Sequence, residues 1–486
     1  MFLSIFLSTF SVYGSVLTEA VTVLGRYKHI SVTIARGFAS SVPVFTSDIN
    51  KAPVNQSKPQ RRSRAEVSSV VTEKTVRILS MDGGGIRALV ALKVLQAVEN
   101  TLRRRASAVN PTEGGIQLGN QRIFDHFDLI VGTSSGALSA LALSLPGKIG
   151  NNLEAPDSVP GSINDLIQLY SKDPEELFGT RLRSLSTAAF PFRAFRRIKQ
   201  VFARKYDNTS MKSYFEKFFE QNKLSNAQTN ILVPAYQIDR RKTFVFHNFP
   251  KIVQKDERGR PKILDWKVGE DLWMGNNDKQ LPFPDFLMSD VAMAASAAPT
   301  YFTPYRIDFN DDRRDGHKMV DSGIFLNNPT LLGYIHAKRI FPTANRFVIV
   351  SLGTGDNVQQ PLNYSLPGGG GAVWGSKFLE ILDGGTTSVT DEQVKSLLNV
   401  ENPRNRHYRI NPTIPPTPLD ETREFKRDIL IQSVTNHFDD QNNMNQLNEI
   451  VDELMVQRTY PIKIPGFPAY DPYFADQFQR IFRNRT

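Results

Sequence analysis

The 486-residue sequence contains no cysteine. This excludes disulfide bonds, a thiol nucleophile and thiolate metal ligands, but it leaves the cellular compartment open. Outside the N-terminal region no run of about 20 apolar residues occurs, so the main part of the chain is expected to be soluble or peripheral. The acidic run 308–312 begins like a calcium-binding loop, yet Arg313 stands where that loop requires glycine. We therefore expect no bound metal and no other cofactor.

Positive charge is in excess, with 59 Lys and Arg against 49 Asp and Glu. A net charge of +10 favours anionic partners, and a phospholipid membrane fits as well as nucleic acid does. No nucleic-acid-binding motif supports the second option. Residues 180–205 hold eight Lys or Arg, no acid and four phenylalanines. Such a stretch is typical of an interfacial segment on anionic lipid, and equally of the solvated face of an ordinary helix.

Residues 1–70 differ in composition from the rest of the chain. The first 18 residues are uncharged, and Arg36-Gly37-Phe38-Ala39-Ser40 resembles a mitochondrial presequence cleavage site. A secretory signal would place basic residues before its apolar stretch, and none precedes it here. We predict a mitochondrial targeting segment, with a secretory or membrane-anchored destination as the alternative. Residues 51–64, rich in Pro, Gln, Ser and Arg, are expected to form a disordered linker.

Residues 132–136 have the form Gly-x-Ser-x-Gly. An apolar stretch at 127–131 is expected to form a buried strand before them, and 137–143 a buried helix after them. A strand-to-helix turn of this kind lifts a serine hydroxyl out of a sheet. We therefore predict Ser134 as a nucleophile between Gly132 and Gly136. The alternative is an ordinary turn of small residues.

A second strand-to-helix turn carries three consecutive glycines, Gly83, Gly84 and Gly85, followed by Arg87. Glycine amides at a helix N-terminus can bind a phosphate or the oxyanion of acyl transfer. A phosphate-binding P-loop would end in Gly-Lys-Ser/Thr, which is missing. A dinucleotide site would need an acidic residue about 20 positions on, where 103–108 read Arg-Arg-Arg-Ala-Ser-Ala. An oxyanion hole, supported by the charge of Arg87, is the favoured interpretation.

A serine nucleophile needs a base. The late histidines are His336, His407 and His437, and none follows a strand in a glycine-flanked loop. Asp321 does, in the sequence Val320-Asp321-Ser322-Gly323. A carboxylate held within hydrogen-bond reach can accept the serine proton directly. On its own this segment would favour a simple turn.

Together these motifs resemble the patatin-like phospholipase family, which is marked by Asp-Gly-Gly-Gly-x-Arg, Gly-x-Ser-x-Gly and Asp-Gly-Gly/Ala. The resemblance covers about 74–415, including the segments 296–302, 351–355 and 375–382. It implies Ser134 as nucleophile, Asp321 as base, and oxyanion amides from Gly83, Gly84 and Gly85 with Arg87 beside them. Ser322 departs from the family glycine, so the turn after Asp321 would be strained if it needed a positive φ.

The expected fold is an α/β domain of three layers, with a mostly parallel sheet wrapped by helices and the Ser–Asp dyad at the carboxyl ends of strands. We predict core strands at 76–81, 127–131, 230–238 and 347–352, and a helix at 285–298 that ends before Pro299. The catalytic domain is expected at 71–415, followed by a helical C-terminal extension at 416–486.

The resemblance implies a lipid acyl hydrolase that cleaves fatty-acyl esters of phospholipids or glycolipids at a membrane surface. Two alternatives remain: a soluble-ester hydrolase or acyltransferase using the same residues, and a non-catalytic lipid-binding or storage protein. Ser134, Asp321 and the three glycines argue against the latter, because a binding role needs no activated serine.

Overall fold

The computed structural model describes part of the chain: residues 73–108, 122–146, 161–171, 174–178, 205–249, 251–255, 261–265, 269–271, 285–309, 316–357 and 371–460. The chain divides into two compact units, Met1–Val70 and Val71–Thr486, and all described residues lie in the second. The predicted targeting segment and linker fall outside the described residues. So does the basic stretch, except for its last residue, Lys205.

The described residues form one large sheet whose centre is parallel. Five parallel strands lie side by side in this order: β12 (Arg406–Ile410), β10 (Arg346–Leu352), β1 (Thr75–Met81), β2 (Leu129–Gly132) and β3 (Asn230–Gln237). Beyond β3 the sheet is antiparallel, with β4 (Lys242–His247), β7 (Gly269–Asp271), β9 (His317–Asp321) and β8 (Tyr305–Ile307). The central strands are buried along nearly their whole length, as expected of a parallel sheet covered on both faces.

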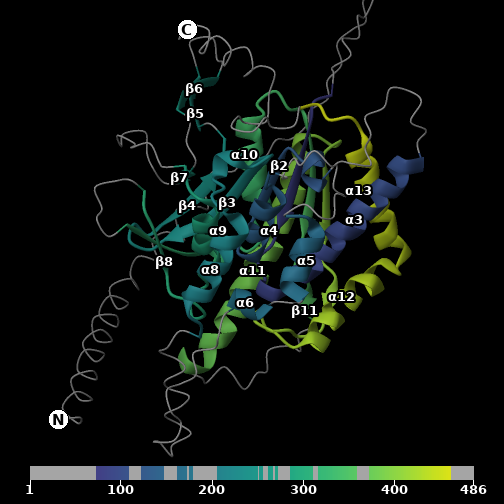
Figure 1. Ribbon diagram of the computed structural model, residues 1–486. Helices are drawn as coiled ribbons and strands as arrows, with labels where there is room; N and C mark the ends of the chain where they lie inside the picture. The colour runs from purple at the N-terminus through teal and green to yellow at the C-terminus, as the bar shows by residue number, and fades with distance from the viewer. Residues whose placement is uncertain are drawn as a thin grey trace, which may run out of the picture. The chain divides into compact units, whose positions relative to one another are not determined.

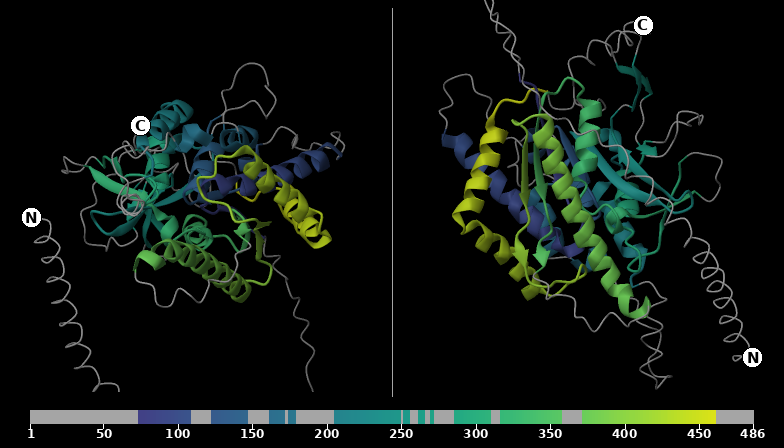
Figure 2. Two further views of the ribbon diagram at one scale, coloured as in Figure 1. Left: turned by 90° about the horizontal axis from the view of Figure 1, so that it is seen from below. Right: turned by 180° about the vertical axis from the view of Figure 1, so that it is seen from behind.

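Helices cover the two faces of this sheet. On one face Leu79, Ile130 and Val350 share a hydrophobic core with eight of the described helices: α3 (Ala88–Ala108), α4 (Ser135–Leu143), α5 (Ile163–Ser171), α6 (Pro174–Phe178), α8 (Asn208–Phe219), α9 (Met288–Ser296), α12 (Glu424–Phe438) and α13 (Gln441–Met455). On the other face, Ile78 and Leu129 pack with α10 (Thr330–Ile340) and α11 (Gly371–Glu401). Figure 2 shows α11 lying across this second face when the molecule is seen from behind. The predicted three-layer α/β fold is confirmed.

The remaining described elements are short or peripheral. They comprise the hairpin β5 (Lys251–Lys255) with β6 (Pro261–Asp265), the pair β11 (Asp356–Asn357) with β13 (Thr413–Ile414), and the 3-10 turns η1 (Gly85–Arg87), η3 (Ile123–His126), η5 (Leu224–Asn226) and η6 (Ser322–Ile324). Among the described residues, no helix combines the length and the apolar character needed to cross a membrane.

The predicted elements are present, with shifted ends. The strand expected at 127–131 begins at Leu129, because the Asp128 carboxylate accepts a hydrogen bond from the Arg77 amide at 2.7 Å and fixes the approach to β2. The helix expected at 285–298 begins only at Met288, since Phe286 and Leu287 lie extended against Lys223 and Leu224. The helix ends at Ser296, before Pro299 as predicted but two residues short of the expected end.

The C-terminal helices are part of the main core. Figure 1 shows α12 and α13 beside α3, at the side of the sheet away from β8. Leu430 and Val434 from α12 and Leu447, Ile450 and Leu454 from α13 are all buried in the cluster that includes α3. The predicted helical extension from residue 416, described as far as residue 460, is therefore packed on the same core as the nucleophile turn.

Candidate active site

The turn between β2 and α4 places Ser134 in a strained backbone conformation. Its φ is 53° and its ψ is −120°, a region that side-chain-bearing residues rarely occupy. The turn passes so close to other backbone that a Cβ atom on Gly132 would lie 2.1 Å from the Gly136 carbonyl oxygen, and one on Gly136 would lie 2.3 Å from that of Met81. Glycine at both positions is a packing requirement. Ser134 is thereby held at the N-terminus of α4, where the helix dipole favours negative charge.

The register of β3 explains how Asp321 reaches Ser134. Strand β2 pairs with β3 only as far as Val131 opposite Leu232. Strand β9 runs in the opposite direction and takes over the same edge of β3, with Asp321 opposite Ala235. The other edge is filled by β4 along 232–237. Because Ala235 lies three residues beyond Leu232, about 10 Å of strand separates the two pairings. The carboxyl end of β9 therefore lies next to the turn that follows the carboxyl end of β2.

Here the Ser134 hydroxyl lies beside the Asp321 carboxylate and, as a hydrogen-bond donor, lowers its pKa. The Gly323 amide donates a hydrogen bond to Asp321 Oδ1 at 2.8 Å. The Asp321 residue is only 4% exposed. Burial raises the pKa of Asp321 to about 6, while the hydrogen bonds from Ser134 and Gly323 oppose the shift. A carboxylate with this pKa is ionised at neutral pH and is a better proton acceptor than an exposed one.

Ser322 does not strain the turn after Asp321. The turn begins as the 3-10 helix η6, and Ser322 is not among the residues with positive φ. Its buried hydroxyl donates to the Pro234 carbonyl oxygen at 3.1 Å. The condition for strain at this position, a positive φ, is not met, and this serine instead anchors the Asp321 turn to β3.

The glycine loop lies between β1 and η1. The Gly83 amide already donates to the Asn327 carbonyl oxygen at 3.2 Å, and the Gly83 carbonyl accepts from Thr354 Oγ1 at 2.9 Å. Gly85 has a φ of +57° and would clash with the Leu419 carbonyl if it carried a Cβ. Within the described residues, the amides of Gly84 and Gly85 have no hydrogen-bond partner. These two, rather than all three predicted amides, are left to bind an oxyanion.

A buried ion pair fixes the start of this loop. The Arg409 guanidinium, from β12, binds the Asp82 carboxylate through two contacts, Nη1 to Oδ1 at 3.0 Å and Nη2 to Oδ2 at 2.5 Å. Arg409 Nη1 also donates to Ser351 Oγ at 2.9 Å. Asp82 is 3% exposed, and burial raises its pKa while Arg409 opposes the shift. Arg409 could not be inferred from the sequence, because no motif marks it and 327 positions separate it from Asp82.

Arg87, the predicted electrostatic support, is buried and paired. Its Nη2 lies 3.5 Å from Asp383 Oδ2 on α11, and its Nε lies 3.5 Å from the Gly84 carbonyl oxygen. Asp383 also accepts a hydrogen bond from Asn327 Nδ2. One carboxylate thus links the glycine loop to the turn that follows Asp321. Asp383 directly follows the segment 375–382 of the resemblance, but its two partners could not be inferred from that position.

The three candidate histidines have other neighbours. His336 on α10 lies beside the rings of His247 and Phe249, and burial holds its pKa well below the usual value. His407 on β12 lies 3.7 Å from Asp391, and burial lowers its pKa to about 4. His437, at the end of α12, contacts Asn443. None of these neighbours belongs to the Ser134 turn.

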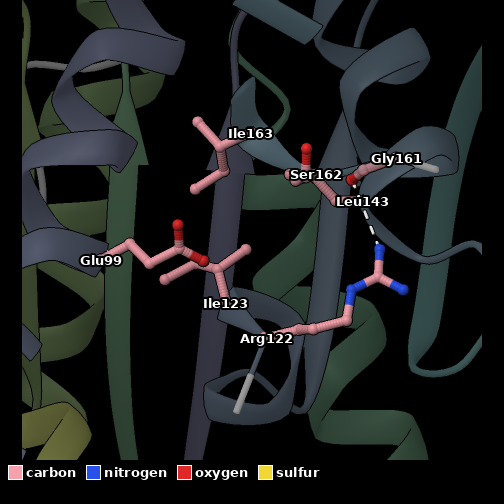
Figure 3. Close-up of a pocket in the computed structure, with 7 residues that line it drawn as sticks. All are labelled: Glu99, Arg122, Ile123, Leu143, Gly161, Ser162 and Ile163. Atoms are coloured by element: carbon pink, nitrogen blue, oxygen red, sulfur yellow. Dashed lines mark hydrogen bonds between the residues drawn. The ribbon is translucent and has the colours of Figure 1, made fainter. Parts of the chain in front are cut away.

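A small pocket lies at the opposite end of α4 and is distinct from this site. Figure 3 shows its lining, in which Arg122 donates to the Gly161 carbonyl oxygen at 3.4 Å, near Leu143 and Glu99. Leu143 is the last residue of α4 and Ser134 precedes its first, so about 13 Å of helix separates them. Among the described residues there is no group of three His, Cys, Asp or Glu side chains placed to hold a metal ion.

Comparison with known proteins agrees with this geometry. The family model described as patatin-like phospholipase matches residues 79–333, a stretch that contains the glycine loop, Ser134 and Asp321. The chain belongs to the patatin-like phospholipase family.

The relatives are distant. Patatin-like protein 2 of Oryza sativa subsp. indica is 26% identical over 313 residues, which cover 61% of this chain and 65% of the rice protein. Patatin-like protein 1 of Arabidopsis thaliana is 25% identical over 364 residues, covering 71% and 72% of the two chains. Patatin group J-1 of Solanum tuberosum is 21% identical over 380 residues, covering 74% and 83%. The chain thus spans slightly less than two thirds of the rice relative. Arg409 and Asp383 lie beyond the stretch that the family model matches.

Proposed function

We propose that this protein is a lipid acyl hydrolase that cleaves fatty-acyl esters through a Ser134–Asp321 dyad and an acyl-enzyme intermediate. The observation that carries this proposal is the position of the Ser134 hydroxyl beside the buried carboxylate of Asp321, whose pKa is raised to about 6. The serine sits in a strained turn, and strain of this kind gathers at functional sites. Membership of the patatin-like phospholipase family supports a lipid ester as substrate.

In the proposed reaction, Asp321 accepts the Ser134 proton while Ser134 Oγ forms a bond to the acyl carbonyl carbon. The carbonyl oxygen becomes an oxyanion next to the Gly84 and Gly85 amides. When the tetrahedral intermediate collapses, the ester C–O bond breaks, and the leaving alkoxide takes the proton from Asp321. Water then attacks the acyl-enzyme and gives a proton to Asp321. When this second tetrahedral intermediate collapses, the bond to Ser134 Oγ breaks, the oxygen takes the proton from Asp321, and the fatty acid is released. The scheme contains no step that requires a metal.

The glycine loop would supply much of the rate enhancement. A single well-aimed oxyanion donor contributes about 3–4 kcal/mol to the stability of the transition state. The ion pairs of Asp82 with Arg409 and of Arg87 with Asp383 hold this loop in place before the substrate arrives. Such preorganisation is effective because the donors need no rearrangement during the reaction.

The proposal is tested with the full-length protein on phospholipid vesicles in the presence of a chelator, with release of fatty acid as the readout. Ser134→Ala and Asp321→Asn should each abolish release while the fold, followed by circular dichroism, is retained. Ser135→Ala is the matched control, because the neighbouring Ser135 hydroxyl has no hydrogen-bond partner among the residues that the structure describes. Its activity should equal that of the parent protein.

Other outcomes would replace the proposal. Activity that survives in Asp321→Asn would exclude the dyad. Turnover of short-chain esters without vesicle hydrolysis, or transfer of the acyl group to an added alcohol in preference to water, would indicate a soluble-ester hydrolase or an acyltransferase. An inactive parent protein whose Ser134 does not react with a fluorophosphonate would indicate a lipid-binding or storage protein.

For residues 1–70 we propose mitochondrial targeting on composition alone. A fusion of these residues to a fluorescent protein should enter mitochondria, and entry into the secretory route would overturn the proposal.

A further inference from the structure

The hairpin that joins β3 and β4 extends beyond the catalytic edge of the sheet. Strand β2 stops pairing at Val131, opposite Leu232, whereas β3 continues to Gln237 and turns at 238–241. Six residues of strand separate Leu232 from Ile238, so the tip lies about 20 Å past the last β2 pairing. The extension points in the direction in which β2 runs, which is the side where Ser134 leaves the sheet.

One face of this extension exposes apolar side chains. Side chains alternate along a strand, and Ala235 and Gln237 are buried while Tyr236 is partly exposed and Ile238 is 37% exposed. On the same face Phe325, which closely follows Asp321, is 39% exposed and packs edge-on against Tyr236 with ring centroids 5.6 Å apart. This apolar group (Tyr236, Ile238, Phe325) therefore adjoins the turn that carries the proposed base.

Positive charge surrounds the apolar group. The turn contains Arg240 and Arg241, Lys242 is the first residue of β4, and Lys318 lies exposed on the neighbouring strand β9. The one acid of the turn, Asp239, is engaged by His317 Nδ1 at 2.8 Å and by the Lys318 amide at 3.1 Å.

Arg241 itself occupies a φ of 55°, where asparagine or glycine would cost less. The turn thus carries its second basic side chain at a position whose backbone does not favour it.

We propose that this hairpin docks on the surface of an anionic phospholipid bilayer. Ile238, Tyr236 and Phe325 enter the level of the lipid headgroups, and Arg240, Arg241, Lys242 and Lys318 contact lipid phosphates. Apolar side chains ringed by Lys and Arg are the combination that binds anionic interfaces. Docking brings the edge of the sheet with Ser134 toward the bilayer. The inference rests on the proposed lipid acyl hydrolase function, since it names how that site meets its substrate.

Binding is measured by flotation of the full-length Ser134→Ala protein with vesicles of phosphatidylcholine, with and without about one third phosphatidylglycerol, so that hydrolysis cannot influence it. Arg240→Glu should weaken binding to the anionic vesicles by at least about fivefold at low salt, since each basic group near the surface contributes about that factor. Ile238→Ser should weaken it by at least about threefold, and this loss should persist at high salt because it reflects apolar burial.

Two control variants make the same kinds of substitution at positions outside the hairpin. Arg104→Glu makes the same charge reversal at an exposed position on α3. This helix lies toward the opposite end of the sheet from β4 (Figure 1). Val400→Ser removes an apolar side chain that is 86% exposed at the end of α11. Both should bind like the parent protein. In the Ser134-containing chain, all four variants should hydrolyse a monomeric soluble ester at the parent rate.

The proposal is overturned if Arg240→Glu and Ile238→Ser bind anionic vesicles as tightly as the parent protein, or if Arg104→Glu and Val400→Ser lose binding equally. Equal binding to neutral and anionic vesicles would also overturn it. Failure of the hydrolase proposal is separate, because it would appear as absent ester turnover in the parent protein while the flotation result stands.

Discussion

At the scale of single residues, the site depends on a carboxyl group held away from water. Asp321 is 4% exposed, and this burial raises its pKa to about 6 against the hydrogen bonds from Ser134 and Gly323. Burial disfavours the ionised carboxylate and so lowers the stability of the folded protein at neutral pH. The same effect makes this carboxylate a stronger base near neutral pH. The two consequences, one for rate and one for stability, can be measured separately.

The first prediction concerns the pH dependence of the reaction. Because Asp321 must be ionised to accept the Ser134 proton, kcat/KM should rise about tenfold per pH unit below an inflection near 6 and level off above it. A monomeric soluble ester followed from pH 4.5 to 8 avoids effects of pH on lipid surfaces. A profile that stays flat between pH 5 and 7 would exclude Asp321 as the base.

The second prediction concerns the pH dependence of stability. The folded pKa of about 6 lies above the ordinary value of 3.8, so the contribution of Asp321 is fully present below pH 4 and is lost as the pH rises through 6. The asparagine in Asp321→Asn does not ionise, so this variant does not lose stability in this way as the pH rises. Relative to the parent, its free energy of unfolding should therefore increase between pH 4 and 7 by up to about 3 kcal/mol. Urea denaturation at several pH values measures this, and a difference independent of pH would contradict it.

The third prediction tests the glycine loop. A Cβ atom on Gly84 would lie 2.3 Å from Thr354 Oγ1 and 2.5 Å from Thr354 Cβ, so Gly84→Ala must displace the loop. We expect kcat to fall by about a hundredfold or more, the usual cost of losing an oxyanion donor. Gly384→Ala on α11 is the matched control, since its added methyl group meets nothing within 4 Å. Comparable activity in the two variants would remove Gly84 from the proposed site.

At the scale of elements, β12 and α11 complete a site whose motifs lie on other parts of the sheet. Strand β12 contributes Arg409, which binds Asp82, and α11 contributes Asp383, which binds Arg87. A buried ion pair contributes little net stability, but removing one partner leaves the other charge uncompensated. These pairs are better explained as devices that hold the glycine loop in one geometry.

The fourth prediction follows for Arg409, which acts on the loop as a positioning residue. In Arg409→Met, kcat calculated per fluorophosphonate-reactive site should fall at least about tenfold, with little change in KM. The reason is that the glycine loop is no longer held in the position where its amides meet the oxyanion. The uncompensated Asp82 should also lower stability by about 3–5 kcal/mol.

Arg409→Lys, which keeps the charge but not the two-pronged contact, should recover stability more than kcat. If kcat per reactive site is unchanged in Arg409→Met, the pair serves only the fold.

At the scale of the whole molecule, the C-terminal helices and the nucleophile turn share one hydrophobic core. Leu430, Leu447, Ile450 and Leu454 are buried beside α3, whose own N-terminus begins just after the glycine loop. Each fully buried aliphatic side chain contributes about 1.5–3 kcal/mol. Their sum is comparable with the whole stability of a typical domain.

The fifth prediction is that a chain ending at residue 423 does not fold. It should be insoluble or lack a cooperative unfolding transition in calorimetry, because one side of α3 loses its cover. A chain beginning at Val71 is the control and should keep the melting temperature of the full protein, since residues 1–70 form a separate unit. A soluble, cooperatively folding chain without α12 and α13 would show that the extension is dispensable.

The sequence by itself determined the local features of this protein. The apolar strand, the small-residue turn and the buried helix around Ser134 are neighbours in the chain, so their pattern is visible without tertiary contacts. The same holds for the strand, glycines and helix at 76–102, and for the strand and turn that end at Asp321. The three-layer α/β fold follows from the alternation of such units.

Only the tertiary structure decided which side chains meet. Asp321 reaches Ser134 because β9 takes over the edge of β3 where β2 ends, and no local pattern encodes that register. Arg409 and Asp383 contact residues of the glycine loop region from which they are separated by hundreds of positions in the sequence. The Gly83 amide, which the sequence offered to an oxyanion, is instead bound by Asn327. Hydrogen bonds and ion pairs depend on distances in space, and a linear pattern fixes those distances only within one element and its adjoining turns.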